Sequence, residues 1–212
     1  MSTKDRILDT AERLFAHHGV EATSLRAITT EADVNLAAVN YHFQSKEALI
    51  HAVIARRLDP VNQERLAMLD ACEAATGSGP LPLDVVLDAL LRPVLEMMAG
   101  SGKEFAPMMG RIFTESSALA EKVFQKHLGH VAQRFLAAFQ RALPDLPRTE
   151  LIWRLQFVMG AVAHIVGGAK LMRVISEGQC DPSDVEGTLR RMESFFLAGF
   201  TAPVPEVQSV AH

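Results

Sequence analysis

Apolar residues recur at the spacing of an α-helix over most of this 212-residue chain. The first stripe lies in residues 6–18 and consists of Ile7, Leu8, Ala11, Leu14 and Phe15. Gly19 follows directly, at the place where a left-handed helix C-cap is expected. The pattern predicts an amphipathic helix that buries one face.

Two short helices joined by a sharp turn are predicted over residues 23–42. Thr23 or Ser24 can cap the first helix and Asn35 the second, while Asp33 lies where the chain must turn. Ser45 can cap a further helix, with Glu47 in its first turn. The side chains expected to be buried are Leu25, Ile28, Ala32, Val34, Ala38 and Val39. Those left facing outward on the second helix are Leu36, Ala37, Asn40, Tyr41 and His42.

The outward side of that second helix carries few charges, unlike an ordinary solvated helix surface. Lys46 also lies at a helix N-terminus, where backbone N–H groups and an ammonium together suit a phosphate. These features favour a helix-turn-helix that binds the major groove of DNA over a plain three-helix bundle. The residues expected to reach base edges are Arg26, Asn35, Leu36, Ala37 and Asn40. Those expected to hold phosphates are Thr23, Tyr41, His42 and Lys46.

Beyond residue 58 the chain is predicted to remain helical. Pro60 is expected to kink or end the fourth helix, which resumes through Ala74 and precedes a loop over 75–82. Further helices are expected at about 83–99, 104–116, 118–143, 148–176 and 182–200. The tail, 201–212, has two prolines and no periodicity and is expected to be disordered. The predicted fold is all-α, with a helix-turn-helix domain at 1–50 and a second helical domain at 51–200.

The N-terminal quarter of the chain resembles the TetR family of bacterial transcriptional repressors. The matching segments read ILDTAERLFAHHG, TSLRAIT, EADV and NYHFQSKEALI. The family usually has Tyr at position 40, whereas here Asn40 precedes Tyr41. A branch of fatty-acid-responsive, PsrA-type regulators is similar in the string VNLAAVNYHF and, more weakly, in ELIWRLQFVMGAVAH and GAKLMRVI. The resemblance implies a C-terminal domain that binds a ligand and forms a dimer.

Large apolar residues rich in Met and Phe mark the second domain. Taken singly they suit a plain core, but as a group they favour an adaptable cavity for a hydrophobic small molecule. Arg111 and His164 lie on otherwise apolar helices and are candidate anchors for a carboxylate. The resemblance implies that a fatty acid or acyl-CoA is the inducer. The candidate ligand-binding residues are Met97, Phe105, Met108, Met109, Arg111, Phe113, Phe124, Trp153, Phe157 and His164.

A run of small residues over 157–169 is expected to let another helix approach closely. The resemblance implies that the last two long helices form a four-helix bundle with those of a second subunit. Intramolecular packing and a helix opening beside the ligand pocket are the alternatives. The candidate dimerisation residues are Gly160, Gly167, Gly168, Met192, Phe195 and Phe196.

The net charge of the chain is −4, and residues 1–58 contain seven basic and seven acidic side chains. A neutral DNA-binding module must rely on a few placed contacts instead of a broad positive field. Cys72 and Cys180 give no disulfide framework or metal spacing, and no signal peptide or membrane-length apolar run is present, which predicts a cytoplasmic protein. His127 and His130 come nearest to a metal-binding pair, yet no third ligand or nucleophile motif accompanies them. The sequence therefore predicts no enzyme, no catalytic residue, no cofactor and no metal.

The predicted function is that of a homodimeric repressor that binds a palindromic double-stranded operator. Two recognition helices related by a two-fold axis need half-sites about one turn or more apart. A hydrophobic effector is expected to release DNA by favouring a different spacing of these helices. The alternatives are a multidrug-type regulator that responds to an aromatic compound and a helix-turn-helix that binds only proteins.

Overall fold

The structure is a computed structural model of the chain, and it describes residues 1–100, 102, 105–115 and 117–205. The side chains of residues 113–115, 117, 166–167 and 169–170 lie outside this description. The described secondary structure is helical, so the predicted all-α fold class is confirmed. The predicted disordered tail falls largely on residues 206–212, which lie outside the described residues.

The first three helices form a compact N-terminal module: α1 (Thr3–His18), α2 (Leu25–Glu31) and α3 (Leu36–Phe43). α1 begins three residues earlier than predicted because Ser2 and Asp5 form a capping box, in which each side chain binds the other's backbone N–H at 3.1 Å. Ser24, not Thr23, caps α2, since its hydroxyl accepts from the Ala27 N–H.

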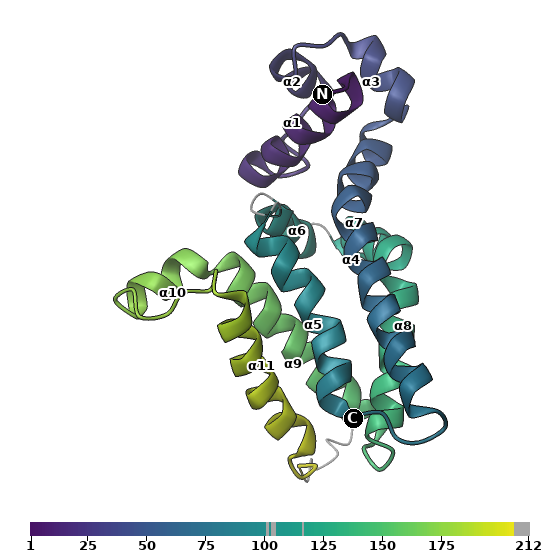
Figure 1. The fold of residues 1–212 in the computed structure, drawn as a ribbon. Coiled ribbons are helices and arrows are strands. Elements are labelled where there is room, and N and C mark those ends of the chain that lie inside the picture. Colours follow the sequence, from purple (N-terminus) through teal and green to yellow (C-terminus); the bar gives the residue numbers. More distant parts are fainter. Residues whose placement is uncertain (101, 103–104, 116, 206–212) are drawn as a thin grey trace, which may run out of the picture.

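Helix α4 (Lys46–Thr76) leaves this module and runs the length of a lower helical bundle (Figure 1). It continues through Pro60, so the predicted kink or stop does not end the helix. Pro60 is exposed, and on the solvent side water can satisfy the carbonyl left without an N–H partner. The predicted domain boundary at residues 50 and 51 falls inside this helix.

The remaining helices form the lower bundle and its two projections. Two predicted helices are divided in the structure: the segment 118–143 contains a π-helical turn, and 148–176 is interrupted at Gly168. A Cβ at Gly168 would lie 2.7 Å from the His164 carbonyl oxygen, so the tight break requires glycine. The elements are α5 (Leu83–Ala99), α6 (Phe105–Glu115), α7 (Ser117–Val123), η1 (Phe124–Leu128), α8 (Gly129–Ala142), α9 (Arg148–Gly167), α10 (Ala169–Ile175) and α11 (Val185–Thr201).

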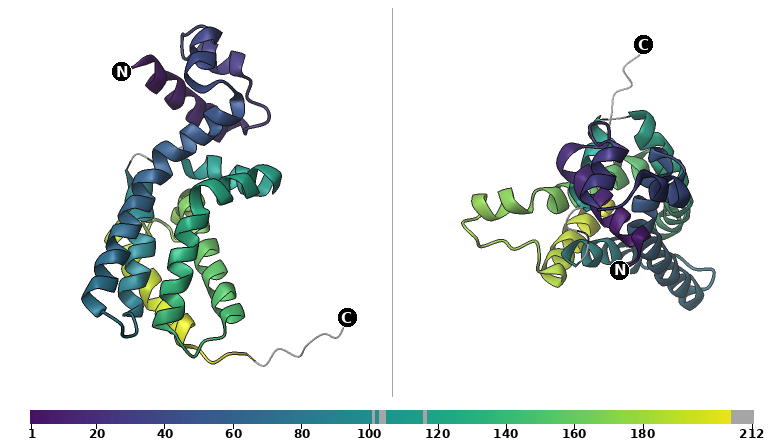
Figure 2. Two further views of the ribbon diagram at one scale, coloured as in Figure 1. Left: turned by 90° about the vertical axis from the view of Figure 1, so that its right-hand side faces the viewer. Right: turned by 90° about the horizontal axis from the view of Figure 1, so that it is seen from above.

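Figure 2 shows two projections that leave the molecule in different directions. In the left view the segment with α7 and η1 extends to the right, and in the view from above α10 with its following loop extends to the left. α10 leaves several apolar side chains exposed, among them Val174 and Ile175, each 74% exposed.

Buried apolar side chains form two separate clusters. The upper cluster joins the core of α1–α3 and the first turns of α4 to Phe105, Met108 and Ile112 of α6. The lower cluster fills the space between α4, α5, α8, α9 and α11. We call the layer between them the seam; α4 crosses it between Leu58 and Leu66. α5 crosses the seam between residues 95 and 97, and η1–α8 crosses it between residues 128 and 131.

Candidate nucleic-acid interface and effector domain

The turn between α2 and α3 is fixed by the backbone at Asp33, which has φ = 50°. This left-handed conformation, tolerated by a short polar side chain, lets the Val34 N–H bind the Thr29 carbonyl at 3.0 Å. Asn35 then caps α3, because its Oδ1 accepts from the Ala38 N–H at 2.8 Å. The predicted turn and cap lie where the sequence placed them, and they set the direction of α3.

Helix α3 buries Val39 and Phe43 and leaves its other side uncovered. Tyr41 is 83% exposed and its ring meets the edge of His42 at 5.1 Å between centroids. The predicted base-contacting residues on this helix are all exposed: Asn35, Leu36, Ala37 and Asn40. An exposed helix face of amide, methyl and aromatic groups has the chemistry that major-groove base edges require.

Two of the residues predicted to bind phosphates, Thr23 and Lys46, make hydrogen bonds within the protein. The Thr23 side chain is only 2% exposed, and its hydroxyl donates to the Gly19 carbonyl at 2.7 Å. The predicted contact between this hydroxyl and DNA is therefore wrong: Thr23 holds the end of α1. Lys46 is half-buried and its Nζ donates to the Glu21 carbonyl at 3.2 Å, while Arg26 is exposed at the start of α2.

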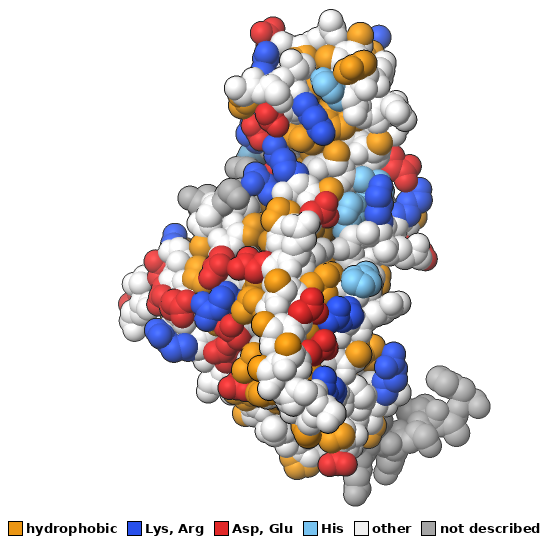
Figure 3. Space-filling view, turned by 45° about the vertical axis from the view of Figure 1, so that its right-hand side comes forward, with side chains coloured by type: hydrophobic (Ala, Val, Ile, Leu, Met, Phe, Trp, Pro, Cys, Tyr) orange, Lys and Arg blue, Asp and Glu red, His pale blue; other side chains and the backbone are white. Residues whose placement is uncertain are grey.

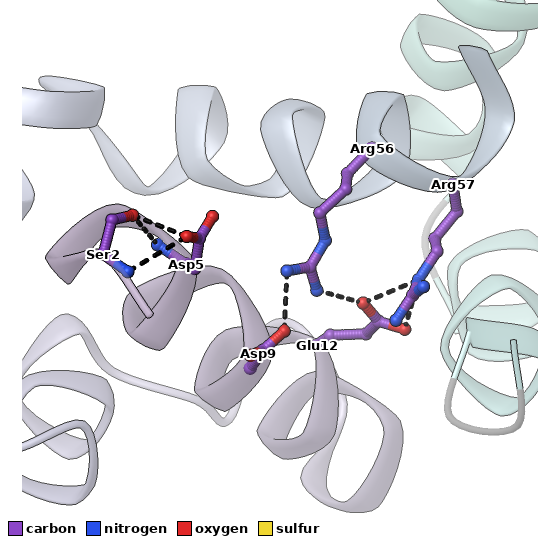
Figure 4. Close-up of polar contacts among 6 residues, drawn as sticks. All are labelled: Ser2, Asp5, Asp9, Glu12, Arg56 and Arg57. Carbon is purple, nitrogen blue, oxygen red and sulfur yellow. Dashed lines mark hydrogen bonds and ion pairs between the residues drawn. The ribbon is translucent and has the colours of Figure 1, made fainter. Parts of the chain in front are cut away.

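A buried ion-pair network joins α1 to α4 below this surface (Figure 4). Glu12 is 3% exposed and lies between two guanidinium groups, with Arg56 Nη2 at 2.5 Å and Arg57 Nε at 3.0 Å. Arg56 also binds Asp9 at 2.6 Å. Burial alone would lower the pKa of Arg56, but the hydrogen bonds to Glu12 and Asp9 outweigh it and the pKa is raised. The network fixes the angle between α1 and α4.

Charges of both signs are interspersed over the N-terminal module, as Figure 3 shows for one face. This distribution agrees with equal numbers of acidic and basic groups in residues 1–58. A surface of this kind gives little long-range attraction to phosphate, so binding must rest on close contacts.

The ten predicted effector residues do not meet in one place. Phe105 and Met108 are buried in the upper cluster, against the helices of the N-terminal module. Arg111 donates to the His17 carbonyl of α1 at 3.2 Å, so it also lies at this junction. Met97 and Met109 are half-buried against the same cluster. The side chain of Phe113 lies outside the described residues.

The other predicted effector residues face outward, so the single predicted pocket is wrong as a set. Phe124 is 45% exposed on η1, and His164 is exposed on α9. Trp153 and Phe157, one turn apart on α9, are 61% and 63% exposed. Three surface depressions are described, and none has any of the ten residues on its wall. The apolar residues identified helices that have an apolar face. They did not show which other helix, if any, packs against that face.

The predicted dimerisation residues are also divided. Phe195 on α11 is 75% exposed, and Gly160 on α9 is exposed beside the Trp153–Phe157 pair. Met192 and Phe196 are instead buried in the lower cluster of their own chain, which corrects their assignment. Gly167 ends α9 and Gly168 forms its C-cap, so neither extends a smooth helix face.

Sequence reasoning missed a row of buried polar groups along α4. Arg65 is 5% exposed; its Nε donates to the Leu90 carbonyl at 2.9 Å, and burial lowers its pKa to about 10. Asn62 is 7% exposed and donates to the His127 carbonyl at 2.8 Å. His51 Nδ1 lies 2.9 Å from His127 Nε2. A signal was present, because Arg65 interrupts the apolar stripe of α4 between Leu58 and Leu69.

The His51–His127 contact predicts acid sensitivity. Desolvation lowers the pKa of both rings from the usual 6.5; Lys126 adds to this on both, and Lys122 on His51. Glu47 opposes the shift at His51, and Asp59 opposes it at His127. Because the folded pKa values are depressed, the contact stabilises fully above pH 6.5 and loses its contribution as pH falls through the folded values.

We therefore expect the melting temperature to fall between pH 7.5 and 5.5 by more in the native protein than in a variant with His51→Gln and His127→Gln. Differential scanning fluorimetry at both pH values measures this. His130→Gln, at an exposed position three residues from His127, is the matched control and should keep the native pH dependence. An equal fall in the native and double variants would contradict the prediction.

Within the described ranges, no group of three His, Cys, Asp or Glu side chains could hold a metal ion. Among the same residues, no helix is both long enough and apolar enough to cross a membrane.

Comparisons with known proteins assign both halves of the chain. Residues 7–53 match the family model described as bacterial regulatory proteins, tetR family, and residues 88–199 match the model described as tetracyclin repressor-like, C-terminal domain. An uncharacterized HTH-type transcriptional regulator from Xanthobacter autotrophicus is 32% identical over 69% of this chain and 64% of its own length. The nicotine-responsive repressor HdnoR of Paenarthrobacter nicotinovorans is 30% identical over 47% of this chain and 53% of its own length.

The fold is that of solved regulators. The fatty acid degradation regulator FadR from Bacillus halodurans superposes with a TM-score of 0.60, at 14% identity, over 96% of this chain and 98% of that one. The alignments to the two curated relatives span less than two thirds of their lengths. Since the two family models cover the helix-turn-helix and most of the lower bundle, the chain belongs to the TetR family of bacterial transcriptional regulators.

Proposed function

We propose that the protein is a dimeric repressor whose binding to a palindromic operator is relieved by a hydrophobic small molecule. The observation that carries this proposal is the exposed side of α3, where Leu36, Asn40 and Tyr41 face outward from a helix fixed by its own cap and turn. In this proposal residues 1–50 bind DNA and residues 51–200 bind the effector and the second subunit.

Base contacts are assigned to Arg26, Asn35, Leu36, Ala37 and Asn40. Asn40 can pair with an adenine edge through two hydrogen bonds, and the methyl groups of Leu36 and Ala37 can touch thymine. Tyr41, His42 and Lys46 are assigned to phosphates. Asn35 Oδ1 already accepts from Ala38, and its amide nitrogen is free to donate to a base.

The second subunit is proposed to cover the exposed apolar residues of α9 and α11. Trp153, Phe157 and Phe195 stand out on these helices, and exposed aromatic groups at this density are characteristic of an interface. Pairing α9 and α11 with the same helices of a second copy would bury them and place two α3 helices on one side of the dimer.

The effector is proposed to act on the junction between the two clusters. α6 packs its Phe105 and Met108 into the upper cluster, and α4 passes through both clusters. A molecule that separates or tilts these helices changes the position of α3. It can release DNA only as far as it binds the DNA-incompetent arrangement more tightly.

Two classes of effector stay open. A fatty acid or acyl-CoA agrees with the similarity to FadR, which is a regulator of fatty acid degradation. An aromatic compound agrees with HdnoR, a nicotine-responsive repressor. Mass spectrometry of small molecules extracted from the native protein separates the two classes.

A gel-shift assay with DNA upstream of the protein's own gene tests the proposal and its residues. Asn40→Ala should lose about 1–3 kcal/mol of discrimination at one base position and leave binding to random DNA nearly unchanged. Lys46→Ala should weaken operator and random DNA alike and reduce the salt dependence by about one phosphate contact. Equal losses on both DNAs for both variants would contradict the assignment, and a protein without any sequence preference would favour a protein-binding module.

A further inference from the structure

Two buried polar residues, Asn62 and Arg65, lie where α4 crosses the seam. Among the described residues, Asn62 has an acceptor without a hydrogen-bond partner, and Arg65 has a charge without a counter-ion. Arg65 is buried, and the Leu90 carbonyl is its only acceptor in the described part of the chain; no carboxylate there pairs with its charge. One turn earlier, Asn62 uses its amide nitrogen on His127, while its Oδ1 is buried and has no hydrogen-bond partner. A buried cation without a counter-ion and a buried acceptor without a hydrogen-bond partner are both costly, so each favours a ligand that supplies what is missing.

The residues that border the seam are apolar and adaptable. On the side of the upper cluster the seam is bordered by Met97 and Met98 of α5 and by Leu128 of η1, all half-buried. Methionine side chains repack easily around a guest molecule. Binding sites also occur preferentially where two packed units meet. The covering segment η1 is a π-helical turn, a conformation that is frequent at functional sites.

We propose that the seam is the effector site, and that Asn62 and Arg65 bind the head group of a monocarboxylic acid with an apolar body. This inference rests on the proposed function and specifies its effector. The planar guanidinium of Arg65 can bind the carboxylate through two parallel hydrogen bonds. The free Oδ1 of Asn62 accepts from a hydroxyl or amide N–H close to the carboxylate. The apolar body lies between Met97, Met98 and Leu128.

This position also gives the ligand a mechanical effect. Asn62 holds η1 through the His127 carbonyl, and the His127 ring contacts His51, which lies on the part of α4 nearer the N-terminal module. A head group bound at the free Oδ1 of Asn62 shifts the same amide group that holds the His127 carbonyl, and an apolar body in the seam pushes the two clusters apart. The upper cluster carries α1–α3, so it moves relative to the lower bundle.

The test compares thermal shifts and gel shifts with four ligands. Dodecanoate should raise the melting temperature and release operator DNA, whereas dodecan-1-ol, of equal length and without charge, should do so at least about 10-fold less effectively. 3-Hydroxydodecanoate should bind more tightly than dodecanoate, and this preference should vanish in Asn62→Leu. 1-Naphthoate distinguishes an aromatic acid from an aliphatic one. Equal responses to dodecanoate and dodecan-1-ol would overturn the proposal.

Arg65→Met provides the matching protein variant. Since it removes an uncompensated charge, the ligand-free protein should melt at the same or a higher temperature than the native one, and its affinity for dodecanoate should fall about 10- to 100-fold. Arg148→Met, at an exposed position, should change neither. Should Arg65→Met not fold, Arg65→Lys should fold and bind dodecanoate more weakly than the native protein. Undiminished binding in either folded variant would refute the inference.

The outcome is separable from the proposed function. Native protein that binds its operator but ignores all four ligands would refute only the seam site. Native protein that binds dodecanoate through Arg65 but shows no preference for any DNA would refute the repressor and leave the site standing.

Discussion

Glu12→Ala should destabilise the protein by about 3–5 kcal/mol and abolish operator binding. Its carboxylate is 3% exposed and neutralises Arg56 and Arg57, so its removal leaves two guanidinium groups close together in a partly buried site. The ion pairs of Glu12 with Arg56 and Arg57 join α1 to α4 (Figure 4), and the angle between these helices sets the position of α3. Urea unfolding and gel shift measure the two effects.

Asp9→Ala is the internal control for this prediction. Asp9 binds the same Arg56, but its side chain is 53% exposed, and exposed ion pairs contribute at most about 1 kcal/mol. We therefore expect a small loss of stability and nearly native operator binding. If both variants lost the same stability, the burial of Glu12 would not be the cause.

Trp153→Asp combined with Phe195→Asp should convert the proposed dimer into a folded monomer. Both side chains are more than half exposed in the single chain, so the introduced carboxylates should change the folding free energy of the monomer little. A dimer interface, in contrast, would have to bury these charges. Without the linked second half-site, operator affinity should fall about 100-fold or more. Light scattering after size exclusion gives the mass, circular dichroism the helical content, and gel shift the affinity.

Phe124→Asp is the control for the dimer variant. Phe124 is also an exposed aromatic residue, at 45%, but it lies on η1, away from α9 and α11, in a segment that projects in a different direction from α10 (Figure 2). It should stay dimeric. A dimeric Trp153→Asp/Phe195→Asp variant would show that another surface holds the two subunits together.

The DNA-binding module could be predicted from the sequence because its signals are local. Ser24, Asn35 and Ser45 each cap the helix that follows, and Asp33 takes the left-handed turn conformation. Each of these depends on a few neighbouring residues, so no knowledge of the rest of the chain was needed.

In the lower bundle the sequence predicted the helices, but it did not predict which residues come together in space. Phe105 and Trp153 belong to apolar stripes of the same kind, yet Phe105 packs on α1 and Trp153 faces outward. Helical periodicity says which side of a helix is apolar, and it carries no information about what covers that side. Arg65 was overlooked for the opposite reason: a charged residue suggests solvent, and only its place in an apolar stripe indicated burial.

The continuity of α4 sets how far a small change in the bundle is amplified. From Asn62 to Lys46 the helix rises about 24 Å, at about 1.5 Å per residue. A tilt of about 5° at Asn62 would displace the Lys46 end by about 2 Å over this length. Two subunits that tilt in opposite directions would change the separation of their α3 helices by about 4 Å, more than the rise of about 3.4 Å between base pairs. A tilt of a few degrees is therefore enough to put one recognition helix out of register with its half-site.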